Sequence, residues 1–112
     1  MQSQSVDFTL VNTSAGQHKE DWHTRKTRYI EHLGLVDQDT LLVSLSDKIH
    51  NARSILRDLR KPEIGEAVWG RFRNSKKDTL WNYRELAKAF MKHLPGQLAK
   101  ELSDIVDELE KN

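Results

Sequence analysis

The chain has 112 residues, the length of a single domain. Hydrophobic residues make up 37% and charged residues 31%, which predicts a thin core beneath a wide solvated surface. The 18 basic and 17 acidic side chains nearly cancel, so net charge does not favour a nucleic-acid partner, and the absence of cysteine excludes disulfides and thiolate metal sites.

The sequence shows neither a membrane span nor an export signal. No stretch approaches the run of about 20 apolar residues that crosses a bilayer. Residues 1–5 lack the basic and apolar regions of a signal peptide. We therefore expect a cytoplasmic protein without a membrane partner.

Residues 1–17 differ in composition from the rest of the chain. They are rich in Ser, Thr, Gln and Asn, with one apolar run at Phe8, Leu10 and Val11. We interpret them as an N-terminal arm and assign residues 18–112 to one helical domain.

The first predicted helix runs from Lys19 to Leu33, with Gly34 as its C-terminal stop. The second can be capped by Asp37 or Asp39 and should end near Arg60, because Pro62 disfavours helical geometry in the residue before it. Its apolar positions step by three and four: Leu42, Leu45, Ile49, Ala52, Leu56 and Leu59.

A short helical turn over residues 64–72 and a polar loop over residues 73–77 are expected next. A third helix is predicted to begin near Asp78 and to end before Pro95 and Gly96, and a fourth carries apolar positions from Leu98 to Leu109. No segment shows the period-two alternation of a strand. The predicted fold class is all-α, an antiparallel helical bundle or array.

A polar stripe follows the second helix opposite its apolar face. Its members again step by three and four: Ser44, Asp47, Asn51, Ser54 and Asp58. Asp47 and Asn51 are one turn apart, with Cβ atoms about 6 Å from each other. A carboxylate and an amide so placed could hold a hard cation beside a polar ligand, with Lys48 neutralising phosphate. By periodicity alone, an ordinary solvated helix face is the favoured explanation of the stripe.

Residues 41–53, which read LLVSLSDKIHNAR, resemble the L-V-x-L-[AS]-D-[KR]-[LI]-H-N-x-R signature of HD-domain phosphohydrolases. The closest group is the guanosine tetraphosphate pyrophosphohydrolases and their small single-domain relatives. The W-x-x-R-K-x-x-Y-I-x-x-L series of residues 22–33 and the T-L-W-x-Y-R-x-L series of residues 79–86 are similar to that group's flanking helices. The resemblance covers about residues 20–110 and corresponds to the C-terminal half of the family domain.

The resemblance implies roles for five residues of this sequence. Asp47 would be a ligand of a divalent metal of the manganese type, and Asn51 would contact a guanine nucleotide. Lys48, with Arg25 and Lys26 on the preceding helix, would lie near the substrate phosphates. His50 belongs to the motif and is expected to pack and orient its helix.

The metal ligands that precede this part of the family are missing. The family uses a His and a His-Asp pair, and none of the five histidines here is followed by Asp. We interpret His18 and His23 as surface residues. One carboxylate holds such an ion weakly, so the chain is expected not to hydrolyse the nucleotide alone, and no catalytic residue is assigned.

Three readings remain open. The chain could be part of an HD phosphohydrolase that needs a partner to supply the missing ligands, a degenerate nucleotide-binding or regulatory module, or a structural helical protein. Losing the other half of the family's core would leave apolar surface uncovered, so a homodimer or a partner chain is expected. Basic residues are interspersed with acids or confined to a loop, and Trp69, Trp81 and Tyr83 are expected to be core or interface anchors, so no nucleic-acid partner is predicted.

Overall fold

The computed structural model describes residues 19–111. The predicted arm of residues 1–17, with His18, lies outside the described residues. Within them there is no strand, which confirms the all-α prediction. The elements in chain order are α2 (Lys19–His32), η3 (Leu33–Leu35), α3 (Gln38–Leu59), η4 (Gly65–Arg71), α4 (Lys76–His93) and α5 (Gln97–Lys111), where η denotes a 3-10 helix.

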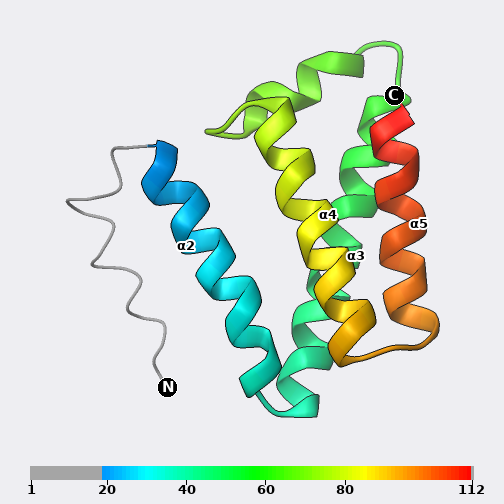
Figure 1. The fold of residues 1–112 in the computed structure, drawn as a ribbon. Helices are drawn as coiled ribbons and strands as arrows, with labels where there is room; N and C mark the ends of the chain where they lie inside the picture. The colour runs from blue at the N-terminus through cyan, green and yellow to red at the C-terminus, as the bar shows by residue number, and fades with distance from the viewer. Residues whose placement is uncertain (1–18, 112) are drawn as a thin grey trace.

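Helices α3, α4 and α5 pack around the core, with α4 antiparallel to α3 and α5, which run parallel to each other (Figure 1). α5 packs against both α3 and α4 along most of its length. Phe90, Leu45 and Leu102 are among the side chains fully buried at their contact. At the rim, Arg53 pairs with Glu101, and Arg84 bonds to both Asp107 and Glu110, so charged pairs also fix α5 in place.

The boundaries of α3 agree with the sequence prediction. Asp37 is the N-cap: its side chain accepts hydrogen bonds from the Thr40 backbone N–H at 3.3 Å and from the Thr40 hydroxyl at 2.6 Å. The Thr40 hydrogen bonds hold the pKa of Asp37 below its ordinary value. One predicted apolar position was wrong, since Leu42 is 44% exposed and Leu41 is buried in its place.

α4 begins earlier than predicted. The Ser75 hydroxyl accepts the Asp78 backbone N–H at 3.1 Å, so Lys76 and Lys77 belong to the helix and not to a polar loop. A Ser followed three residues later by an acidic residue is a known start signal. The prediction missed it because the first turn carries no apolar side chain.

The end of α2 also differs from the prediction. The α-helix stops at His32 and continues as a 3-10 turn over Leu33–Leu35. Gly34 is not a left-handed cap, because only Gly65 and Gly96 have positive φ among the described residues. Instead Gly34 approaches His93: a Cβ at this position would lie 2.8 Å from the His93 ring. The glycine therefore allows close contact between η3 and the end of α4.

α2 lies at the edge of the molecule beside α4 (Figure 1). It contacts α4 and η3 and touches α3 little. None of its described side chains, residues 22–32, is fully buried. None of the helices in the described range is long and apolar enough to cross a membrane.

Candidate functional site

The polar stripe of α3 is exposed over its first half and covered at its end. Asp47 and Asn51 are exposed and Ser44 is half-buried. Asp58 was expected to share this solvated face but is buried, with its carboxylate 2.8 Å from the Arg71 guanidinium of η4. Only the first part of the predicted stripe, from Ser44 to Asn51, is therefore accessible to a ligand. Asp58 at its end serves the packing of α3 against η4.

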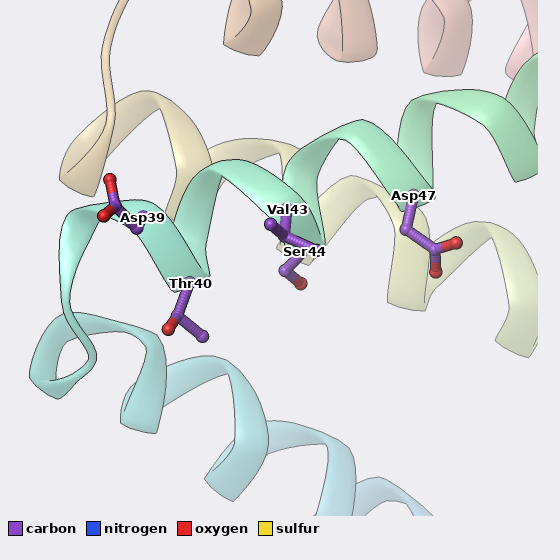
Figure 2. Close-up of a pocket in the computed structure, with 5 residues that line it drawn as sticks. All are labelled: Asp39, Thr40, Val43, Ser44 and Asp47. Atoms are coloured by element: carbon purple, nitrogen blue, oxygen red, sulfur yellow. The ribbon is translucent and has the colours of Figure 1, made fainter.

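A shallow groove follows the exposed part of the stripe. It is lined by Asp39, Thr40, Val43, Ser44 and Asp47, and its volume is about 470 Å³. Figure 2 shows these side chains along one stretch of α3, with α2 running beside it. Small-molecule sites have volumes of about 300–1,000 Å³, so the groove has the size of a ligand site, although it is open to solvent.

α2 and α3 face each other in a defined antiparallel register. The Tyr29 hydroxyl lies 3.2 Å from the Ser44 hydroxyl, within hydrogen-bond distance. One turn further along, Lys26 lies near enough to Lys48 for their charges to repel.

Three of the predicted phosphate-binding residues form a cationic cluster, which comprises Arg25 and Lys26 from α2 and Lys48 from α3. All three side chains are half-buried. Burial lowers the pKa of Lys26 from its ordinary 10.5, and repulsion by Lys48 and Arg25 lowers it further. The fold therefore holds like charges together, an arrangement that an anion would relieve.

Within residues 22–111, no acidic side chain forms an ion pair with the cluster. Among the described residues, neither Lys26 nor Lys48 makes a side-chain hydrogen bond or ion pair, and the Arg25 Nε is buried without a hydrogen-bond partner. Lys26 Nζ does lie over the Trp22 ring, 6.0 Å from its centroid. Buried donors are normally satisfied, so the Arg25 Nε is a donor that an anion beside Lys26 could use.

Asp47 lies on the α4 side of this cluster. Burial raises the pKa of the Tyr83 phenol, and the nearby Asp47 carboxylate raises it further. Tyr83 is a buried residue of α4. Tyr83 was predicted to be a core or interface anchor. Its proximity to Asp47 could not be predicted from the sequence, because it depends on how α3 and α4 pack.

The described residues do not fit a firmly held divalent metal. No three His, Asp or Glu side chains in residues 19–111 come together in a way that could hold an ion. Asp47 offers a single carboxylate, and Asn51, one turn away, adds only an amide oxygen. Divalent ions such as Mg²⁺ and Ca²⁺ require several oxygen ligands in defined geometry, so no chemistry can be assigned to a metal on these residues.

The structure differs from the sequence analysis at two histidines, in part at His23 and fully at His50. His23, expected at the surface, is half-buried, and its Nε2 lies 3.1 Å from the Asp78 carboxylate of α4. His50, expected to pack, is exposed. The His23 contact leaves no periodic signal because it joins α2 to α4, whereas His50 lies about 100° around the helix from buried Ile49, a position that periodicity alone places on the exposed face.

Comparison with known proteins gives no family. No protein-family model matches the sequence, and no curated protein matches it.

Proposed function

We propose that this protein binds a phosphorylated guanine nucleotide between α2 and α3 and does not hydrolyse it on its own. In this proposal the chain is related to the C-terminal half of the HD phosphohydrolases, as the LLVSLSDKIHNAR string of residues 41–53 suggests. The cationic cluster binds the phosphates and Asn51 contacts the rest of the nucleotide. Asp47 is a metal ligand only when further donors are supplied.

The observation that carries the proposal is the cationic cluster itself. Lys26 of α2 feels the charges of both Lys48 on α3 and its own neighbour Arg25, and none of the three forms an ion pair with an acidic residue among the described residues. Holding like charges close destabilises a fold unless an anion joins them. A polyphosphate brings several negative charges and many acceptor oxygens, and it can accept the unmade Arg25 hydrogen bond.

The expected lack of hydrolysis follows from the donor set. Metal-dependent phosphohydrolases use the ion to acidify a water molecule and to stabilise the leaving phosphate. Asp47 with Asn51 is too small a set to position that ion. A second chain that presents His and Asp side chains beside Asp47 would complete the site.

Calorimetric titration of the purified protein with guanosine tetraphosphate tests binding. We expect saturable binding without added metal, weakened about tenfold in Lys48→Gln because a charge-assisted contact is lost. Lys92→Gln is the matched control, because Lys92 is exposed on α4 and makes no ion pair among the described residues. Equal affinities for the two variants and the unaltered protein would refute the proposal.

Incubation with the same nucleotide and Mn²⁺ tests the absence of turnover. We expect no release of pyrophosphate above the buffer rate. Release at an ordinary enzymatic rate would show that the chain is a complete enzyme and would overturn this half of the proposal. Binding without metal favours a regulatory module, whereas binding that appears only with Mn²⁺ and a second chain favours a two-part enzyme.

A further inference from the structure

α2 carries two of the three cations but is loosely attached to the rest of the molecule. The helix touches α3 little, and none of its side chains from residue 22 to residue 32 is fully buried. Its position relative to Lys48 therefore depends on a small number of contacts with α4 and η3 and on the Tyr29–Ser44 contact with α3.

The contact with α4 is an aromatic cluster around a hydrogen bond. His23 Nε2 lies 3.1 Å from Asp78 Oδ1, and the Asp78 side chain is buried. The His23 ring packs against the rings of Trp81 and Trp22, with centroid distances of 4.3 and 5.0 Å, and the two tryptophan rings are 5.9 Å apart. Because the acceptor is a carboxylate, the ring N–H donates, and such a bond to a charged group is stronger than a neutral one.

The same turn of α2 carries the cations. Arg25 and Lys26 follow His23 by two and three residues, and the Trp22 ring of the aromatic cluster lies beneath the Lys26 ammonium at 6.0 Å. A helix turn moves as a rigid unit. Any displacement of His23 from α4 therefore changes the distance from Arg25 and Lys26 to Lys48.

We propose that His23 and Asp78 are positioning residues of the anion site, because their hydrogen bond inside the Trp22–Trp81 cluster holds the cationic turn of α2 opposite Lys48 and Asp47. The inference rests on the proposed nucleotide-binding function. It assigns the control of nucleotide affinity at the cationic cluster to a contact between α2 and α4 that lies outside the cluster.

Calorimetry with guanosine tetraphosphate tests this on three variants of the full chain. His23→Ala removes the donor and is expected to weaken binding about tenfold. His23→Gln retains an amide donor of similar reach and should restore most of the affinity, which a purely structural contribution of the imidazole ring would not do. His32→Ala is the matched control, because His32 is an exposed histidine of the same helix.

Amide hydrogen exchange supplies a readout that is independent of ligand. In His23→Ala the amides of α2 should exchange faster, while those of α3 and α5 keep their protection, since the main core does not include this contact. Loss of protection in every helix would instead show general unfolding and would overturn the positioning role.

The outcomes separate the two proposals. Unchanged affinity in His23→Ala, with Lys48→Gln weakened, would overturn the positioning role and leave the proposed function standing. No nucleotide binding by the unaltered protein would overturn both. Weak binding in His23→Ala that His23→Gln does not restore would assign the effect to ring packing and would also contradict the role of the hydrogen bond.

Discussion

Lys26 is the residue at which stability and the proposed function conflict. Its ammonium is half-buried beside Lys48 and Arg25, and this environment lowers its pKa. The charged form is thus disfavoured in the free protein and favoured when an anion arrives. Groups with shifted pKa values concentrate at functional sites for this reason.

This conflict predicts opposite effects of Lys26→Gln on stability and binding. Removing the charge relieves repulsion, so the free energy of unfolding should rise slightly, by up to about 0.5 kcal/mol, the usual limit for surface changes. Nucleotide affinity should fall. Urea unfolding and calorimetry on the same preparation measure both quantities, and a variant that is less stable and binds as before would contradict the account.

The lowered pKa also predicts how binding depends on pH. Lys26 is charged below its pKa, so affinity for the nucleotide should decline as pH rises through a range below the ordinary lysine value of 10.5. Lys26→Arg stays charged throughout and should flatten this decline. An identical alkaline decline in the two proteins would assign the effect to another group.

The lowered pKa of Asp58 predicts that the fold loses stability in acid. The Arg71 hydrogen bond is the main cause that lowers its pKa below the ordinary 3.8, and the nearby Lys61 adds to it. The stabilisation is present above the unfolded-state pKa and is lost as pH falls through the folded-state value. Denaturant unfolding below about pH 4 should show a steep loss of stability in the unaltered protein. Asp58→Asn should show a shallower loss, and equal slopes would assign the acid sensitivity elsewhere.

At the scale of elements, sequence patterns predicted helices well where the helix builds the core. α3 begins and ends as expected because its N-cap Asp37 and the later Pro62 act locally. The start of α4 and the end of α2 were missed because they depend on a polar cap at Ser75 and on the packing of Gly34 against His93. Local rules therefore predicted both ends of α3, and they failed where the first turn carries no apolar side chain or where another element sets the end.

The cap of α4 can be tested directly. Ser75→Ala removes the acceptor of the Asp78 N–H and should destabilise the protein by about 1 kcal/mol, which lowers the melting temperature by about 4 °C. Ser46→Ala is the matched control, because Ser46 is an exposed serine of α3 with no hydrogen bond from its side chain among the described residues. Equal melting temperatures for the two variants would show that the cap contributes nothing.

The candidate site shows the same limit of sequence reasoning. Asp47 and Asn51 were placed on one helix face by their spacing, with Lys48 flanking them. Their position opposite Arg25 and Lys26 came only from the family resemblance, since it depends on the Tyr29–Ser44 contact and on the His23–Asp78 bond. Neither contact leaves a periodic signal, because each joins helices that are distant in sequence.

At the scale of the whole molecule, apolar side chains remain uncovered near the groove. Leu35 is 80% exposed and Val43 is 71% exposed, on the segment that joins α2 to α3 and on α3 itself. The sequence predicted a homodimer or a partner chain, and these residues are the ones that such a partner would cover.

Light scattering at micromolar concentration measures this association. We expect a mass of twice 13.1 kDa for the unaltered protein, and the monomer mass for the double variant Leu35→Ser/Val43→Ser, which removes apolar contact area. A monomer mass for the unaltered protein would exclude the homodimer, and the remaining expectation would be a different partner chain.

The central claim is that the cations of α2 and α3 form an anion site beside Asp47. An NMR titration of the backbone amides with guanosine tetraphosphate tests it most directly. We expect saturable changes in amide chemical shift that are largest at Arg25, Lys26 and Lys48 and smaller along α5. Shifts confined to η4 or α5, or no shifts at millimolar nucleotide, would contradict it.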